Sequence, residues 1–205
     1  MQHFLITRYN LKKKDWSKDK NGKEILTKAW HDERARLFLD YCLPSVQAQT
    51  NKNFDWIVFF QEDLKHLISP EILNSKAFFP YFADSYEDFE FKLWDVLNYY
   101  DDELTISSRL DNDDMVSPDF IADIQALATP DYCIDVPNGE KLYLDTGKRK
   151  PYTVNNNHFI SLCERKGEKK GVFHRMHFEY RTYPTIRAKK RLWTEVIHST
   201  NKINR

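Results

Sequence analysis

Glycine is scarce in this chain, with 5 residues among 205. The sequence contains neither G-x-G-x-x-G nor G-x-x-x-x-G-K-[ST], which nearly excludes a phosphate site built on a glycine-rich loop. Cysteine is also scarce, because the chain has only Cys42, Cys133 and Cys163. These three residues lie far apart and are odd in number, so they predict neither a disulfide framework nor a zinc motif, and they fit a reducing cytosol.

Long apolar runs are missing as well. No stretch of the sequence is long enough to cross a bilayer, and the first residues lack the pattern of a signal peptide. We therefore expect a cytoplasmic protein with at most peripheral membrane association. Hydrophobic residues make up 41% of the chain and aromatic residues 15%, which argues against disorder. A chain of this length predicts one domain with a sizeable core.

The net charge is zero, but charges of opposite sign are segregated along the chain. Residues 62–138 carry 4 basic and 18 acidic side chains, whereas residues 139–205 carry 16 basic and 6 acidic ones. Acidic and basic faces can simply pair or be solvated. Alternatively, an acidic half that binds metal faces a basic half that holds an anionic substrate such as a nucleoside diphosphate. The basic residues are too dispersed to favour nucleic-acid binding.

The hydrophobic pattern predicts an α/β fold. Residues 3–9 and 55–61 are apolar runs of strand length, and the second has the composition of a buried parallel strand. Between them, Asp32 is an N-cap candidate for a helix that Pro44 should kink or split. A strand, a helix and a strand in about 60 residues predict a right-handed βαβ unit.

The rest of the chain continues in the same way, with no internal repeat. Ser69 and Ser117, each followed by proline, predict two further helix starts. The other expected elements are an exposed loop at 12–28, a helix at 86–100, strands at 104–110 and 132–136, a turn at 137–139, a hairpin of 141–144 with 152–154, and a strand near 193–198.

The most informative segment is the acidic cluster after the strand at 104–110. Asp111, Asp113 and Asp114 crowd the carboxyl end of this strand, which is where open α/β sheets bind ligands. Carboxylates this close repel one another unless a positive charge lies among them, and a hard divalent cation meets that need. The same residues can instead form a polar turn. An EF-hand loop is excluded because its glycine is absent.

Several segments together resemble the bacterial putative rhamnosyltransferase family, whose members are glycosyltransferases of GT-A type with a DxD-like motif. The segments are 4–10 (FLITRYN), 36–38 (RLF), 42–51 (CLPSVQAQTN), 54–57 (FDWI), 108–114 (SRLDNDD), 159–164 (FISLCE) and 192–201 (LWTEVIHSTN). They cover most of the chain in order. The first, the SRLDNDD and the last segments are the most specific.

The resemblance implies a GT-A fold with a mainly parallel central sheet flanked by helices and a small mixed region on the acceptor side. It implies a single domain over residues 1–205, with a nucleotide-binding half at about 1–136 and an acceptor-side half at about 137–205. It also implies a site for Mn²⁺ or Mg²⁺. In that site Asp113 would be the principal ligand, Asp111 would lie near the ribose and the metal, and Asp114 would be a further carboxylate.

Other site residues follow from the same resemblance. Many GT-A enzymes complete the metal site with a late histidine, for which His198 is the candidate, although it can equally be an ordinary polar residue at a strand end. Arg8 would contact the nucleotide-sugar, or form a surface ion pair. Arg109 would do the same, but a structural ion pair with the aspartates is favoured.

An inverting transferase also needs a general base, and Glu164 is the first choice, with Glu179 and Asp135 as rivals.

We therefore expect a metal-dependent glycosyltransferase. It would move a sugar from a nucleotide-sugar donor to a glycan or lipid-linked saccharide in bacterial surface polysaccharide synthesis. No nucleic-acid partner is expected. Two alternatives stay open: a non-catalytic glycan- or nucleotide-binding protein of the same fold, and a nucleotidyltransferase. The second usually needs a glycine-rich or lysine-bearing phosphate loop near the first strand, which residues 6–10 lack.

Overall fold

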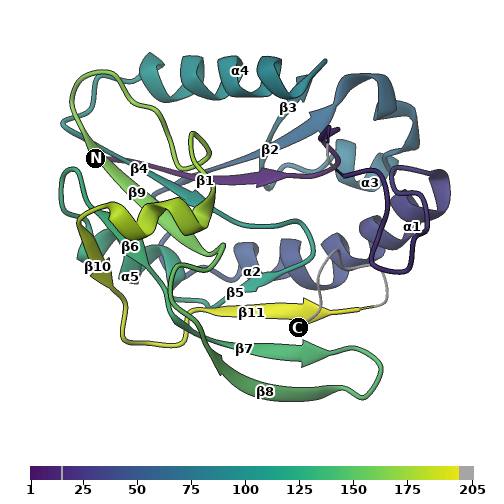
Figure 1. Cartoon of the computed structure of the whole chain (residues 1–205). Helices are drawn as coiled ribbons and strands as arrows, with labels where there is room; N and C mark the ends of the chain where they lie inside the picture. The colour runs from purple at the N-terminus through teal and green to yellow at the C-terminus, as the bar shows by residue number, and fades with distance from the viewer. Residues whose placement is uncertain (15, 199–205) are drawn as a thin grey trace.

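A seven-stranded sheet forms the centre of the computed structural model, which describes residues 1–14 and 16–198 (Figure 1). The strands lie in the order β10-β6-β9-β4-β1-β2-β3. Their bounds are β1 Gln2–Arg8, β2 Asp55–Gln61, β3 Phe79–Ala83, β4 Leu104–Arg109, β6 Cys133–Asp135, β9 Ile160–Arg165 and β10 Thr185–Arg187. Strand β1 is parallel to β2 and β4, whereas β9 is antiparallel to both β4 and β6.

Both faces of the sheet are covered. Helix α4 (Tyr86–Tyr99) lies over one face, and α1 (Lys28–Leu37), α2 (Leu43–Gln47) and α5 (Phe120–Leu127) lie on the other (Figure 1). The remaining helical segments are the π-helical η1 Phe38–Cys42, the 3₁₀ segments η2 Glu62–Leu67 and η3 His177–Thr182, and the short α3 Pro70–Leu73. Because β1 and β2 are buried on both faces, they read as continuous apolar runs, as the sequence predicted.

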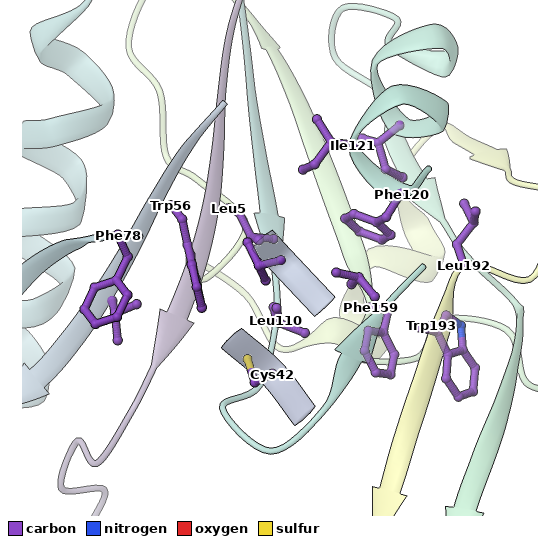
Figure 2. Close-up of a cluster of buried hydrophobic side chains, with 14 of the residues drawn as sticks. Leu5, Cys42, Trp56, Phe78, Leu110, Phe120, Ile121, Phe159, Leu192 and Trp193 are labelled. Atoms are coloured by element: carbon purple, nitrogen blue, oxygen red, sulfur yellow. The ribbon is translucent and has the colours of Figure 1, made fainter. Parts of the chain in front are cut away.

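The core has one layer on each face of the sheet. Alternate residues of the strands point to opposite faces, so Leu5 and Trp56 join the layer under α2 and α5, whereas Phe4 and Phe59 join the layer under α4. Figure 2 shows part of the first layer. It extends to the aromatic pair Phe159 and Trp193, which stack with ring centroids 4.7 Å apart.

The remaining strands form a second sheet of four strands, the small sheet. Its order is β5-β11-β7-β8, with bounds β5 Met115–Val116, β11 Trp193–Ile197, β7 Asn138–Tyr143 and β8 Lys148–Thr153. Strands β7 and β8 form the expected hairpin, but its pairs run from Asn138–Thr153 to Tyr143–Lys148 and do not join 141–144 to 152–154. Gly139 lies directly under Trp193, since a Cβ at this position would come 2.1 Å from the indole Cδ2. Only glycine allows so close an approach.

Three local predictions were wrong. The first helix begins at Lys28 and not at Asp32, because the Thr27 side chain accepts a hydrogen bond from Trp30 N. Helix α5 begins at Phe120, with Asp119 and not Ser117 at its N-cap position. The expected turn at 137–139 runs instead into strand β7.

Other local predictions were confirmed. Ser69 caps α3 by accepting from Ile72 N, and the helix that contains Pro44 is divided, with an α-helical part that follows a π-helical one.

Strands β9 and β10 follow residue 136 yet join the large sheet, so the expected boundary near that residue does not separate the two sheets. Among the described residues, no helix is long and apolar enough to cross a membrane.

Candidate active site

A cleft of about 520 Å³ lies where β1 and β4 end. The large sheet contributes Arg8 and Arg109 at the ends of these strands, followed by the acidic cluster. The small sheet contributes Lys141, Trp193 and Glu195 to another part of the wall. The cleft therefore occupies the position at which parallel α/β sheets bind ligands, and its volume is in the usual range for a ligand pocket.

Asn112 holds the acidic turn against the end of β1. Its side-chain amide donates to Tyr9 O at 2.6 Å, and its oxygen accepts from Arg34 Nη1 at 3.2 Å. The turn is closed by a hydrogen bond from Asp114 N to Asp111 O. Because Asn112 points into the protein, the cluster is anchored at its centre and its three carboxylates are distributed around that anchor.

Asp111, Asp114 and His158 form one group. Each has a potential ligand atom, and these atoms all lie within 4.8 Å of one another. His158 Nε2 lies 2.9 Å from Asp114 Oδ2, and Val196 N donates to Asp114 Oδ1 at 2.9 Å. Two carboxylates and an imidazole are a donor set that suits Mn²⁺ better than Mg²⁺, which prefers oxygen ligands alone. Sequence reasoning predicted both aspartates but missed His158, which follows three asparagines in a polar loop.

Asp113 belongs to a different group. Its carboxylate forms a buried ion pair with Arg34, and His198 Nε2 lies 2.9 Å from Asp113 Oδ2. Asp113 and His198, both expected to bind metal, therefore lie in contact with each other, as predicted. Asp113 also pairs with Arg34, and neither residue belongs to the group of Asp111, Asp114 and His158. The last residues of the segment that contains His198, 199–201, lie outside the described residues. Arg34 is a site residue that sequence reasoning missed, since it reads as an ordinary basic residue of an amphipathic helix.

The charges around the cluster shift its pKa values in opposite directions. Burial alone would raise the pKa of Asp111, but the charges of Arg109, His158 and Arg8 hold it well below its ordinary value. Burial would also raise the pKa of Asp113, but the charge of Arg34 keeps it below its ordinary value. Burial raises the pKa of Asp114, which has no guanidinium partner and is further raised by the neighbouring aspartates. Asp114 and His158 are in hydrogen-bond contact, so the two groups titrate as a pair.

Two arginines line the cleft beside the cluster. Arg109 holds Asp111 with contacts of 3.1 and 3.2 Å to both carboxylate oxygens, as expected from the preference for a structural ion pair. Arg8 donates to Tyr86 Oη at 2.8 Å. Both guanidinium groups lie against the ring of Phe173, at 4.5 Å for Arg8 and 5.4 Å for Arg109. These contacts keep two cations at the cleft wall.

The structure does not bring Glu164 to this cluster. Strand β9 is antiparallel to β4, and Glu164 pairs in register with Thr105 near the start of β4, whereas the aspartates follow its end. Its carboxylate instead accepts hydrogen bonds from Lys170 N and Gly171 N. The rivals are also engaged elsewhere, because Glu179 accepts from Met176 N and Asp135 from Asn156 N. None of the three lines the cleft.

His177 also lines the cleft. Burial lowers the pKa of its imidazole to about 4, so the ring is neutral at physiological pH. Its Nδ1 is buried and has no hydrogen-bond partner among the described residues. The ring centroid lies 6.5 Å from that of His158, which places a neutral imidazole beside the Asp111 group.

Solved structures share this architecture. Crystal structures of residues 1–349 of S. aureus TarS match with TM-scores of 0.56 for a complex with UDP-GlcNAc and 0.53 for a complex with UDP. Sequence identity is 10% and 11%, and the matches cover 98% and 96% of this chain but 60% and 61% of TarS 1–349. The chain thus spans about three fifths of these structures, and the likeness shows the fold. No curated protein sequence matches it.

A family comparison agrees with the fold. Residues 4–186 match the family model described as "Putative rhamnosyl transferase", which is most of the chain. The mostly parallel sheet, the cleft at its strand ends and the TarS likeness are those of a GT-A glycosyltransferase fold. The chain therefore belongs to the putative rhamnosyl transferase family of GT-A glycosyltransferases.

Proposed function

We propose that this protein transfers a sugar from a nucleotide-sugar donor to a hydroxyl of a glycan or lipid-linked saccharide, with the help of a divalent cation, in bacterial surface polysaccharide synthesis. The observation that carries the proposal is the grouping of Asp111, Asp114 and His158 in a cleft that two arginines also line. Family membership supports glycosyl transfer, and the likeness to the TarS complex with UDP-GlcNAc supports a nucleotide-sugar donor.

The donor set fits a divalent cation. Asp111, Asp114 and His158 would hold it, and Mn²⁺ accepts this mixture of oxygen and nitrogen ligands. A bound cation supplies positive charge for the diphosphate as it leaves the sugar. Asp113 is the weaker candidate because its carboxylate lies outside that group and is paired with buried Arg34.

The arginines give the chain its own contribution to diphosphate binding. Arg8 and Arg109 are held against Phe173 at the ends of neighbouring strands, so their positions are set before a ligand arrives. Guanidinium groups recognise phosphate oxygens in a planar, bidentate geometry. A nucleoside diphosphate that enters the cleft would place its charge between these groups and the Asp111 group.

Thermal unfolding in the presence of nucleotides tests the proposal. UDP, GDP, dTDP and CMP are each added with and without Mn²⁺, because a ligand that binds the folded state raises the midpoint. We expect a shift for one nucleotide that disappears with EDTA, and this result would also identify the donor class. A shift that ignores metal would contradict the cation site, and no shift with any nucleotide would contradict donor binding.

Turnover separates transfer from the alternatives. The nucleotide-sugar of the selected nucleotide is incubated with the protein, and free nucleoside diphosphate is quantified by chromatography. Release of nucleoside diphosphate supports glycosyl transfer. Tight metal-dependent binding without any release would favour a non-catalytic binding protein, and release of inorganic pyrophosphate from a nucleoside triphosphate would favour a nucleotidyltransferase.

A further inference from the structure

The small sheet presents to the cleft a charged pair that is not part of the group of Asp111, Asp114 and His158. Strand β11 runs parallel to β7, and Glu195 and Lys141 are partners in this register. Lys141 Nζ lies 3.5 Å from Glu195 Oε2, and the side chains are only 6% and 19% exposed. Both residues line the cleft. A largely buried carboxylate therefore lies on the part of the cleft wall that the small sheet forms.

Lys141 is itself held in place by a third residue. Its Nζ lies 4.0 Å from the ring centroid of Tyr152 on the adjacent strand β8, a cation–π contact, and Tyr152 as a whole residue is 37% exposed. Aromatic rings with a free face are suited to contact with the apolar face of a sugar. Glu195, Lys141 and Tyr152 thus give this wall an aromatic surface beside a carboxylate.

Glu195 differs from the other acids of the cleft in its partners. Asp111 is held by Arg109, Asp113 by Arg34 and His198, and Asp114 by His158 and the Val196 amide. Glu195 is the cleft acid outside that cluster, among the described residues. Glu195 comes from the small sheet, whereas the arginines that are proposed to hold the diphosphate come from the large sheet, and this separation favours contact with the acceptor.

We propose that Glu195 is the general base of the transfer, an inference that rests on the proposed function. The acceptor oxygen forms a bond to the anomeric carbon of the donor sugar as its O–H bond breaks. The proton passes to the Glu195 carboxylate. The bond between the anomeric carbon and the diphosphate oxygen breaks, and its electron pair leaves with the nucleoside diphosphate. Charge and atoms balance with no further reactant.

Glu195→Gln tests the assignment, because the amide keeps the shape of the side chain but cannot accept the proton in the same way. General base catalysis typically contributes about 10²–10⁴-fold to a rate. The rate at which nucleoside diphosphate is released, as the sugar passes to water or to an acceptor, should therefore fall by at least about 100-fold. UDP-GlcNAc is the first donor probe, and it is replaced by another nucleotide-sugar if the nucleotide panel selects one. Donor affinity should stay within about twofold of the wild type.

Glu140→Gln is the matched control. Glu140 precedes Lys141 on β7, so its side chain lies on the opposite face of the sheet, where it pairs with Arg149 away from this cleft. This control should release nucleoside diphosphate at the wild-type rate. Urea unfolding of both variants checks that each is folded under the assay conditions.

Azide gives a readout that a purely structural role would not produce. Azide is a nucleophile that needs no deprotonation, so it should restore nucleotide release by Glu195→Gln and yield a glycosyl azide detectable by mass spectrometry. A release rate within about threefold of the wild type, or a slow variant that azide fails to restore, would overturn the assignment of Glu195. Failure of the wild-type protein to bind any nucleotide would instead contradict the proposed function.

Discussion

His158 Nε2 lies 2.9 Å from Asp114 Oδ2, although 44 residues separate them. Asp114 follows the end of β4 in the large sheet, and His158 lies in the loop between β8 and β9. The contact therefore joins the acidic turn to a loop that leaves the small sheet. Since Val196 of β11 donates to the other oxygen of Asp114, this one carboxylate connects both sheets.

Removing the imidazole should weaken the proposed cation site. We expect His158→Gln to lower the apparent affinity for Mn²⁺, measured by titration of Mn²⁺ against nucleotide binding, by about 10–100-fold, which is the effect typical of losing even an outer partner of a metal ligand. His66→Gln, at an exposed position of η2, is the control and should leave the titration unchanged. An unaltered Mn²⁺ affinity in His158→Gln would exclude His158 as a ligand.

Arg34→Met should cost the protein stability whether or not metal is present. Arg34 and Asp113 are both buried, and removal of one partner of a buried ion pair leaves an uncompensated charge that costs about 3–5 kcal/mol. Urea unfolding in EDTA measures this loss. Arg36 lies on the same helix but is itself exposed and pairs with partly exposed Glu33 and exposed Asp40, so Arg36→Met should change the unfolding free energy by less than about 1 kcal/mol. Equal losses in both variants would contradict the buried-pair interpretation.

Gly139→Ala should displace the indole of Trp193. The added methyl group overlaps the ring, and overpacking of this kind typically costs about 1–3 kcal/mol in the free energy of unfolding. In a Trp193→Ala background the same change should cost far less, because the atom it meets is gone. A double-mutant cycle in urea measures the coupling, and additive effects of the two changes would show that the contact is absent.

The stability of the protein should fall in mild acid partly through His3. Burial lowers the pKa of His3 to about 3 in the folded state, where its ring contacts Ser108 Oγ at 2.8 Å. In the unfolded chain its pKa is about 6.5, so between these values only the unfolded state takes up this proton. The contribution is thus complete above pH ~6.5 and is lost as the pH falls towards 3, by up to about 1.4 kcal/mol per pH unit.

His3→Gln provides the comparison for this pH dependence. Urea unfolding at pH 7, 6 and 5 should give a shallower fall in the free energy of unfolding for the variant than for the wild type. Parallel curves for the two proteins would mean that His3 is not kept neutral by the fold.

Local patterns predicted the elements that short-range chemistry controls. The strands with continuous apolar runs and the helix at 86–99 appear nearly where expected, because burial on both faces and helical spacing leave direct marks in the sequence. Helix starts were less certain, since Thr27 and Asp32 are both acceptable caps and only the path of the preceding chain selects Thr27. The first residues of β7 were mistaken for a turn, because Gly139 serves the packing of Trp193 and not a change of direction.

The candidate site likewise combines features that the sequence predicts with features that it does not predict. The sequence by itself determined that Asp111, Asp113 and Asp114 follow a buried strand, because a dense run of carboxylates at a strand end is a local pattern. Only the tertiary structure decided which of them join His158, which one Arg34 holds, and that Glu164 lies far from all of them while Glu195 reaches the cleft. These outcomes depend on strand order and direction, and the antiparallel placement of β9 and the return of β11 to β5 are set by long-range packing that no short segment records.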